Sequence, residues 1–389
     1  MKVKEFLKYI VFRMIAGITK VFYLRKKLEK KVVFTAFSGL RYDCNPRAIS
    51  EKLNIMYPNY RQIWLMKEFD SRIPDYITQI KYGSVKMFKE LLTAKVWVDN
   101  GTKSLWINKR RGQLFIQTWH GGLGFKKMGT DAQSGFNKID ELRDKHSMSM
   151  TNILLSDSKS MTEVYKGVWP YYKGKILECG FPRTDILYDI DKRKEIATEV
   201  RKELDIPNDT VLVLYAPTYR NNDDISVYKM DYNRIINELK NKLGRNVVFA
   251  IKLHNWSKHL IYKLNCFSDT VINATDYPNM QKISIAADYF ITDYSSGIFD
   301  FAIQRKPAFI YANDLENYVN HERGLYFDIK NMPFPFSNDT DELISNMINL
   351  SVEDYIEKLN LFYKEMGFVD TPNSSEKICK LINRFIVDY

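Results

Sequence analysis

The stretch YFITDYSSGIFDFA, residues 289–302, determines the fold class expected for this chain. Its first four residues are two aromatic residues followed by the β-branched residues Ile and Thr. This composition favours a buried strand. A polar turn follows at residues 293–297, and the apolar segment after it has the character of a helix. A strand that ends in a polar turn and runs into a helix is typical of a parallel sheet covered by helices. The segment therefore predicts an α/β protein.

The same alternation extends in both directions from this segment. A first series of expected strands covers residues 32–37, 62–66, 76–82, 96–99, 113–118, 152–155 and 175–179. A second series follows a charged helical stretch around residues 191–204 and covers 211–215, 247–253, 270–273, 289–292 and 308–311. A chain of 389 residues is long enough for two domains. We therefore expect two α/β halves of similar size, joined near residues 190–208.

Composition excludes several protein classes. The chain is 45% hydrophobic and contains four widely separated cysteines, so a disulfide scaffold or a Cys-based zinc site is not indicated, and a reduced, cytoplasmic compartment fits. Neither GxGxxG nor GxxxxGK[ST] follows an expected strand, which removes the usual support for a dehydrogenase or a P-loop NTPase. A GxSxG nucleophile motif is also missing. No carboxylate cluster with recognisable Mg²⁺ spacing is evident, although dependence on a divalent cation stays open.

Positive charge is concentrated at the amino terminus. Residues 1–31 hold ten Lys and Arg against two Glu, which accounts for +8 of the net charge of +11. Residues 9–24 are mostly apolar, but they are too few and too charged for a membrane span. Arg13 and Lys20 would share one side of a helix, so this segment predicts either an amphipathic helix in the interface of an anionic membrane or a terminal helix packed on the protein. No RNA-binding aromatic signature accompanies the charge, so we expect no nucleic-acid partner.

The sequence QTWHGG, residues 117–122, begins in the last two residues of the expected strand 113–118 and supplies a candidate catalytic group. Imidazole titrates near neutral pH, so His120 could accept a proton from an attacking hydroxyl, and Gly121 and Gly122 would let the backbone approach a ligand. The alternative is a turn histidine bonded to the backbone. Lys126 and Lys127, a few residues on, could meet phosphate or a membrane, or could be solvated.

Polar residues also close three strands of the second series. Thr218 and Arg220 would offer a hydroxyl and a guanidinium fork to a phosphate, although turn chemistry explains this pattern equally well. Ser295 and Ser296 would form an anion site at a helix start, or would simply cap the helix. His254 ends an apolar run, where a satisfied histidine at the sheet edge is the default. Ligands of open α/β sheets bind beyond the carboxyl ends of strands, so these clusters could line one cleft.

Taken in order, the motifs of this chain resemble one enzyme family. They are Asn45-Pro46-Arg47-Ala48, Thr118-Trp119-His120-Gly121, Gly180-Phe181-Pro182-Arg183-Thr184-Asp185, Ala216-Pro217-Thr218-Tyr219-Arg220, Thr292-Asp293-Tyr294-Ser295-Ser296 and Arg323-Gly324-Leu325-Tyr326-Phe327-Asp328. This ordered series resembles the CDP-glycerol glycerophosphotransferases, which build teichoic-acid and related capsular polyol-phosphate chains. The resemblance covers roughly residues 32–368. Gly122-Leu123-Gly124-Phe125 departs from the Thr-Pro that the family often has there, which leaves glycerol, ribitol and other polyols open.

The resemblance implies a GT-B-like fold, with two Rossmann-type domains facing across a cleft and a basic amphipathic helix at the amino terminus. We expect a membrane-associating segment at 1–31, an acceptor domain at 32–190, a CDP-polyol domain at 208–370 and a terminal helix at 371–389. The expected location is peripheral, on the cytoplasmic face of the cell membrane. A chain without the extra amino-terminal domain of large polymerases is expected to be a short, primase-like or capsule-type transferase.

The implied reaction moves a polyol phosphate, most often glycerol phosphate, from a CDP-polyol to a hydroxyl of a lipid-linked saccharide or a growing chain, releasing CMP. By resemblance, His120 is the general base, and the donor phosphate and nucleotide are bound by His254, Thr218, Arg220, Asp293, Ser295 and Ser296. The acceptor-side loop is expected to be Gly121, Gly122, Lys126 and Lys127. The alternatives are a GT-B glycosyltransferase that uses a nucleotide sugar, or a non-catalytic scaffold that binds membrane or nucleic acid.

Overall fold

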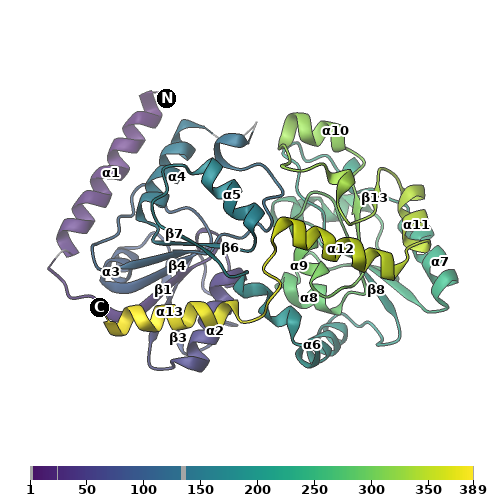
Figure 1. Ribbon diagram of the computed structural model, residues 1–389, viewed down its shortest axis with the longest axis horizontal. Helices are drawn as coiled ribbons and strands as arrows, with labels where there is room; N and C mark the ends of the chain where they lie inside the picture. Colours follow the sequence, from purple (N-terminus) through teal and green to yellow (C-terminus); the bar gives the residue numbers. More distant parts are fainter. Residues whose placement is uncertain (1–2, 24, 133–136, 389) are drawn as a thin grey trace.

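A computed structural model describes residues 3–23, 25–132 and 137–388 of the chain. It consists of two lobes, each built on its own sheet, lying side by side (Figure 1). The first lobe has a seven-stranded sheet of order β3-β2-β1-β4-β5-β6-β7, and the second has a six-stranded sheet of order β10-β9-β8-β11-β12-β13. Every pairing in both sheets is parallel. The chain is therefore an α/β protein with two Rossmann-like domains, as the sequence predicts.

The strands of the first sheet are β1 (Glu29–Thr35), β2 (Arg61–Met66), β3 (Ile77–Lys81), β4 (Ala94–Asp99), β5 (Leu114–Gln117), β6 (Ile153–Ser156) and β7 (Lys175–Glu178). Those of the second are β8 (Val211–Tyr215), β9 (Val247–Ile251), β10 (Val271–Asn273), β11 (Tyr289–Thr292), β12 (Ala308–Tyr311) and β13 (Phe336–Ser337). The central strands are buried along their whole length, because helices cover both faces of a parallel sheet. All twelve expected strands are confirmed. The two-residue strand β13 was not expected, since it carries no sequence periodicity.

The helices are α1 (Val3–Tyr23), α2 (Cys44–Met56), α3 (Val85–Thr93), α4 (Lys138–Met150), α5 (Lys159–Val168), α6 (Ile190–Glu203), α7 (Tyr232–Leu243), α8 (Met280–Ala286), α9 (Gly297–Ala302), α10 (Leu315–Asn317), α11 (Thr340–Ile348), α12 (Val352–Met366) and α13 (Ser374–Asp388). Most begin where a polar side chain accepts a backbone N–H of the first turn, as Ser158 does for α5 and Asp231 for α7. The short helices used below are η1 (Phe37–Gly39), η3 (Pro182–Tyr188), η5 (Asn255–Leu264) and η6 (Tyr318–Glu322).

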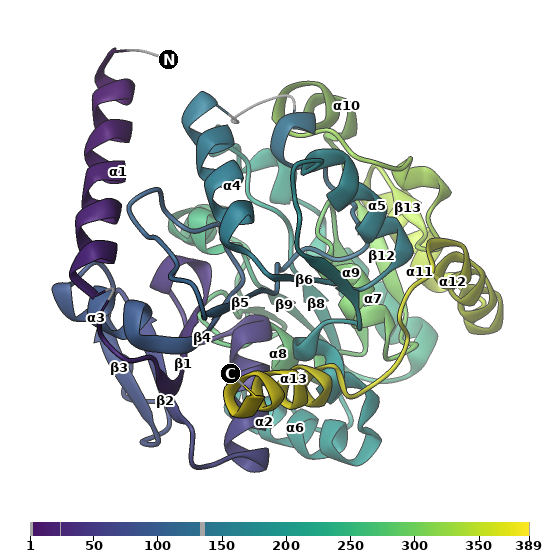
Figure 2. The same ribbon diagram turned by 60° about the vertical axis from the view of Figure 1, so that its left-hand side comes forward.

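The chain crosses between the lobes twice, and its carboxyl end returns to the first lobe. Helix α12 packs on the core of the second lobe, whereas α13 lies against α2, where Ile378 and Ile382 join Ile49 and Leu53 in one core (Figure 2). The two crossing segments are tied together, because the carboxylate of Asp185 in η3 accepts the backbone N–H groups of the first two residues of α13. The lobes are therefore joined by a pair of adjacent connections rather than by one linker.

Two further contacts hold the lobes together near the ends of the strands. Arg183 in η3 makes a bidentate ion pair with Asp300 in α9, with N–O distances of 2.7 and 3.0 Å. The loop after β5 also reaches the second lobe, where Phe125 is buried among the rings of Phe299 and Phe327. This loop belongs to the first lobe by sequence, but it is packed into the second.

Helix α1 lies at the outer edge of the first lobe (Figure 1). Arg13 points inward and contacts Nδ1 of His146 in α4 at 2.8 Å, and Ala16 is fully buried. Exposed apolar side chains recur along α1 at Leu7, Val11, Met14, Ile18, Val21 and Phe22. Residues 1–2 and 24 of the basic segment, and residue 389, lie outside the described residues. Among the described residues, no helix has both the length and the apolarity that crossing a membrane requires.

Candidate active site

His120 lies just beyond the carboxyl end of β5, on the side of the first lobe that faces the second. Its Nδ1 is 2.8 Å from the backbone oxygen of Asn100. A carbonyl only accepts hydrogen bonds, so Nδ1 carries the proton of the neutral ring and Nε2 carries the free lone pair. The ring is stacked on Trp119 and meets Phe37 edge-on, at centroid distances of 5.1 and 5.4 Å. The imidazole is thus oriented with its basic nitrogen away from the Asn100 carbonyl.

The surroundings of His120 favour the neutral ring. Although the side chain is accessible to solvent, the walls around it desolvate the imidazolium and lower its pKa to about 4. The positive charges of Arg183, Arg323 and Arg41 lower the pKa further, against the opposing effect of the Asn100 carbonyl. At neutral pH the ring is therefore unprotonated, which is the state a general base needs.

His254 occupies the corresponding place in the second lobe, after β9. Here Nδ1 accepts the backbone N–H of Trp256 at 3.3 Å, so Nε2 carries the proton and is a hydrogen-bond donor. Desolvation lowers the pKa of His254 to about 4, and the charges of Arg41, Lys126 and His120 act in the same direction. His120 and Arg41 belong to the first lobe and His254 to the second, so the charges that act on His254 come from both lobes; the region between the two histidines is called the gap below. The two histidines have opposite tautomers, with the lone pair on Nε2 of His120 and a proton on Nε2 of His254.

Thr218, Arg220 and Asp293 form a buried cluster at the ends of β8 and β11. One oxygen of Asp293 accepts the N–H and the hydroxyl of Thr218 at 2.8 and 2.5 Å, and the other accepts Arg220 at 2.9 Å. Arg220 is also paired with Asp314 at 2.7 Å and lies over the rings of Tyr294 and Tyr318. Arg220 and Asp293 are 4% and 2% exposed, so their charges are already neutralised by protein. This cluster fixes the loops of the site.

Lys126 extends from the loop after β5 to this cluster. Its Nζ lies 3.5 Å from Thr218 Oγ1 and 5.8 Å from the centre of the Tyr318 ring. Desolvation lowers the pKa of Lys126 to about 7, with Asp293 opposing and Arg323 and Arg220 reinforcing the shift. The structure thus places Lys126 beside the residues expected to bind the donor, although the sequence grouped it with the acceptor side. Because this amine titrates near neutral pH, a bound phosphate would favour its charged form.

The rest of this loop is shaped by contacts that glycine permits. A Cβ on Gly122 would lie 2.6 Å from a carboxylate oxygen of Asp157, whose oxygens accept the N–H of Leu123 at 3.0 and 3.2 Å. A Cβ on Gly121 would meet nothing closer than 3.6 Å. The backbone of Lys127 pairs with the second lobe, since its N–H donates to Gly324 at 2.9 Å. Gly122 and Lys127 therefore anchor the loop at its two ends.

Ser295 and Ser296 form the turn between β11 and α9, and both are partly exposed. Ser295 Oγ accepts the N–H of Gly297 at 3.2 Å, and Ser296 makes no side-chain cap hydrogen bond. The turn follows Asp293 directly, so it lies at the same edge of the second sheet as the cluster around Thr218. Two hydroxyls at this edge can donate hydrogen bonds to an anion in the gap.

Three basic residues near the histidines were not identified as site residues from the sequence. Arg41 follows β1, Lys252 follows β9, and Arg323 closes η6. Lys252 donates to the carbonyls of Ala274, Thr275 and Tyr277, so it ties two loops together. Arg323 donates to the carbonyl of Lys127 at 2.6 Å. Lys252 stands two residues before His254, and Arg323 begins one of the motifs quoted above. These two sequence positions were the only signals that could have identified Lys252 and Arg323 as site residues.

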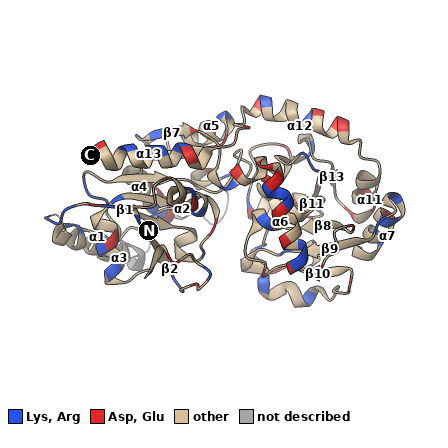
Figure 3. Ribbon diagram, turned by 90° about the horizontal axis from the view of Figure 1, so that it is seen from below, with Lys and Arg blue, Asp and Glu red and all other residues tan. Residues whose placement is uncertain are grey.

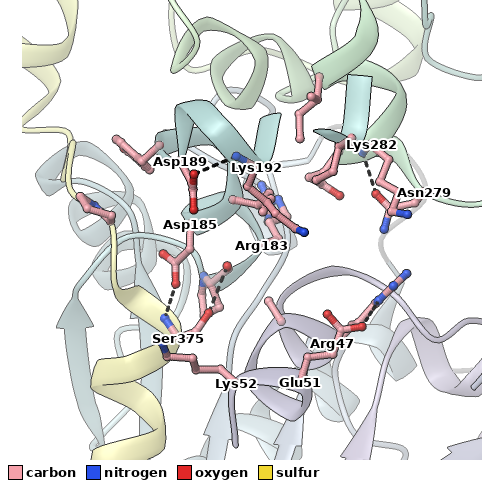
Figure 4. Close-up of a pocket in the computed structure, with 18 of the residues that line it drawn as sticks. Arg47, Glu51, Lys52, Arg183, Asp185, Asp189, Lys192, Asn279, Lys282 and Ser375 are labelled. Carbon is pink, nitrogen blue, oxygen red and sulfur yellow. Dashed lines mark hydrogen bonds and ion pairs between the residues drawn. The ribbon is translucent and has the colours of Figure 1, made fainter. Parts of the chain in front are cut away.

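A groove of about 890 Å³ lies beside this site, between the lobes (Figure 4). It is lined by α2, η3, α6 and α8, and its basic and acidic side chains are paired, as Arg47 is with Glu51 at 2.8 Å and Lys282 with Glu199 at 3.0 Å. Figure 3 shows the same alternation of charge along α6. Cys44 and Arg183 line the groove, whereas neither histidine does. The groove therefore follows the connection between the lobes and is distinct from the gap between the histidines.

No group of three or more His, Cys, Asp or Glu side chains suited to a metal ion occurs among residues 3–23, 25–132 and 137–388. Basic side chains of both lobes, among them Arg41 and Lys126, act on the two histidines, and the hydroxyls of Ser295 and Ser296 lie at the end of β11. This arrangement suits a substrate that carries phosphate and a reaction that moves one proton.

Comparison with known proteins agrees with this chemistry. The chain is 29% identical over 368 residues to a teichoic acid poly(glycerol phosphate) polymerase of Staphylococcus epidermidis, which covers 92% of this chain and 51% of the relative. It is 29% identical over 390 residues to a teichoic acid glycerol-phosphate transferase of Staphylococcus aureus, covering 94% and 96% of the two chains. This chain spans about half the length of the S. epidermidis polymerase and of a similar polymerase from Bacillus subtilis.

The fold has a counterpart among solved structures. The structure of the H548A variant of the wall teichoic acid polymerase TagF superposes with a TM-score of 0.83 at 28% identity, covering 100% of this chain and 99% of that one. A TagF variant has also been solved after a soak with CDPG. The model of one protein family, CDP-glycerol:poly(glycerophosphate) glycerophosphotransferase, matches residues 18–384. The chain therefore belongs to the CDP-glycerol:poly(glycerophosphate) glycerophosphotransferase family.

Proposed function

We propose that this protein transfers glycerol phosphate from CDP-glycerol to a hydroxyl of a growing polyol-phosphate chain or of a lipid-linked saccharide, releasing CMP. The observation that carries the proposal is the pair of histidines with opposite tautomers, one from each lobe, facing each other among basic side chains. Family membership and the names of two of the more similar relatives, a poly(glycerol phosphate) polymerase and a glycerol-phosphate transferase, support the choice of donor. We propose a GT-B-like arrangement with the acceptor on the first lobe, which supplies the base, and the donor on the second.

In the proposed reaction His120 is the general base. Nε2 takes the proton of the acceptor hydroxyl as its oxygen attacks the phosphorus next to glycerol. The new bond forms between that oxygen and phosphorus, and the bond from phosphorus to the bridging oxygen breaks. CMP leaves with the electron pair of the broken bond. The N–H at Nε2 of His254 donates to the phosphate oxygens as charge shifts toward the leaving group.

The residues around the donor divide into two kinds. Lys126, Ser295 and Ser296 present N–H or O–H groups at the edge of the gap, and we propose that they contact the donor phosphates. Thr218 already donates its N–H and its hydroxyl to Asp293, so we propose that it positions Lys126 rather than donating to phosphate. Arg220 and Asp293, which are saturated by protein partners, hold those groups in place. Their proposed contribution is indirect, and this refines the direct phosphate contact that the resemblance implies for Arg220. Groups fixed before the reaction stabilise developing charge without reorganising.

We also propose that α1 attaches the protein to the cytoplasmic face of an anionic membrane. Exposed apolar side chains recur on α1 every three to four residues, including Met14 and Ile18, and basic residues flank the helix. The double variant Met14→Glu, Ile18→Glu is expected to lose sedimentation with vesicles of anionic lipid. Val85→Glu, on an exposed position of α3, is a control that should keep binding. Equal binding of both variants would contradict the proposal, and retention with RNA instead of vesicles would favour the scaffold alternative.

A panel of donors tests the proposed activity. The purified protein is incubated with CDP-glycerol, CDP-ribitol or UDP-glucose and a lipid-linked acceptor, and CMP, UDP and the lipid product are measured by chromatography and mass spectrometry. CMP release from CDP-glycerol and a product heavier by one or more glycerol phosphate units are expected. His120→Gln should lower the rate by about 10²–10⁴-fold. UDP release with a sugar-bearing product would instead identify a glycosyltransferase.

A further inference from the structure

The loop between β1 and α2, residues 36–43, has a strained backbone that the proposed roles of the two histidines do not explain. Phe37, Ser38 and Gly39 all adopt the left-handed region, with φ of 48°, 56° and 83°. A non-glycine residue in this region costs about 1–3 kcal/mol, and such strain is retained mainly at functional sites. A Cβ on Gly39 would lie 3.0 Å from the backbone oxygen of Leu65, so close packing keeps the loop in this form. The same loop brings Phe37 into contact with the ring of His120 and the guanidinium of Arg41.

This loop is bound to the group that orients His120. The N–H of Phe37 donates to Oδ1 of Asn100 at 2.7 Å, and the backbone oxygen of the same asparagine accepts Nδ1 of His120. The Phe37 ring meets the His120 ring edge-on, and the guanidinium carbon of Arg41 lies 4.8 Å from the centre of the Phe37 ring. Arg41 and His120 therefore share one aromatic wall. Their relative position is fixed by Asn100 and Phe37.

The guanidinium of Arg41 is incompletely paired. Its nearest ion-pair partner, Asp43, is 4.0 Å away, and its Nε is buried with no hydrogen-bond partner. By contrast, Arg183 and Arg220 each make bidentate contacts to a carboxylate. Leaving a buried donor unpaired is costly, and the cost is recovered when an anion binds. Arg41 therefore has free donors suited to phosphate oxygens.

The groups whose pKa values Arg41 changes indicate which parts of the molecule its charge reaches. The positive charge of Arg41 lowers the pKa of His120 in the first lobe and of His254 and Lys252 in the second. His120 belongs to the first lobe and His254 and Lys252 to the second, so Arg41 acts on groups of both lobes. The charge of Lys126, which belongs to the proposed donor site, also acts on His254.

We propose that Arg41 binds the diphosphate of the nucleotide donor from the His120 side of the gap, so that the transferred phosphoryl group is held from both lobes. This inference rests on the proposed function for the identity of the donor. The guanidinium fork can contact two phosphate oxygens at once, which the single ammonium of lysine cannot do. Binding the diphosphate in this way places phosphorus between the base on one lobe and the donor groups of the other.

Arg41→Gln and Arg41→Lys test the proposal in the full-length protein. We expect kcat/KM for CDP-glycerol to fall by about 10²–10³-fold in Arg41→Gln, with only partial recovery in Arg41→Lys, while KM for the acceptor stays unchanged. Arg72→Gln is the matched control, because Arg72 is exposed and paired only with Asp70 at the surface. A loss that appears only in the acceptor KM, or wild-type kcat/KM in both Arg41 variants, would overturn the proposal.

Two further measurements test the role of Arg41 without relying on a large fall in the reaction rate of the variant. Inorganic pyrophosphate, measured by calorimetry, should bind Arg41→Gln at least tenfold more weakly than wild type, since a hydrogen bond to a charged group is lost. Equal binding would overturn the proposal whatever the substrate is. Removing the Arg41 cation should also raise the pKa of His120, so activity is lost at a higher pH as acid is added. If wild type binds pyrophosphate through Arg41 but never releases CMP from CDP-glycerol, the proposed function fails while this anion site stands.

Discussion

The acid side of the pH–rate profile gives the sharpest test of the role of His120. The structure holds its pKa at about 4, through desolvation and three neighbouring cations. A general base must be unprotonated, so activity is lost as pH falls through this pKa. At pH 5.5 a group with a pKa of about 4 is still roughly 97% unprotonated, whereas an ordinary histidine would be about 9% unprotonated. Between about pH 7.5 and 5.5, protonation of His120 should therefore lower kcat/KM by only a few per cent instead of about tenfold. Lys126, with a pKa of about 7, becomes charged over the same range, and this can only favour binding of the anionic donor.

The assay is continuous CMP release from CDP-glycerol between about pH 5 and 8, because a diphosphate diester does not titrate in that range. The profile of kcat/KM reports the free enzyme and that of kcat reports the substrate complex. A bound diphosphate would offset the cations near His120 and raise the pKa of the ring, so the acid limb of kcat should lie at higher pH than that of kcat/KM. A tenfold decline of kcat/KM by about pH 5.5, removed in His120→Gln, would show that the ring titrates normally and would refute the reasoning.

Three other perturbations follow from the contacts that hold the site. Arg183→Ala leaves the partly buried carboxylate of Asp300 without its bidentate partner, although Gln281 still donates to it, so urea unfolding should show a loss of about 2–4 kcal/mol; an unchanged transition would contradict this reasoning. Gly122→Ala should lower stability by about 1–3 kcal/mol because its Cβ would collide with Asp157, whereas Gly167→Ala, inside α5 with open space around it, should raise stability by about 0.5–1 kcal/mol. Burial raises the pKa of Asp157 to about 7, above its unfolded value, so the folded protein holds a proton that the unfolded chain releases. Stability should therefore decline from about pH 4 to 7, and Asp157→Asn should flatten this decline in thermal melts; equal slopes would contradict it.

Much of the fold could be predicted from sequence because strand signals are local. Runs such as VLVLY at β8 are buried on both faces, and their ends are marked by polar turns. Motifs at those ends also indicated where ligand groups would gather, since parallel strands place their carboxyl ends at one edge. The exception, β13, is two residues long and exists only because it pairs with β12.

The roles of individual site residues were less accessible from sequence. Arg220 and Asp293 read equally well as phosphate ligands, and only the structure shows that each is occupied by protein partners. Arg41 carried no motif at all, because its significance depends on Phe37 and Asn100, which are brought together by the ends of β1 and β4. Lys126 was grouped with the acceptor-side loop by its position in the chain, and only the structure shows that its Nζ lies 3.5 Å from Thr218 Oγ1 in the second lobe.

The sequence by itself determined the α/β class, the two halves, the family and the histidine after β5, because apolar periodicity and short motifs are properties of neighbouring residues. Only the tertiary structure decided which nitrogen of each histidine is free, which cations are unpaired and which loops meet across the gap. Those properties depend on contacts between residues far apart in the chain, such as Asn100 with His120 and Asp300 with Arg183. They also depend on burial, because the same side chain is harder to charge in the protein interior than in water.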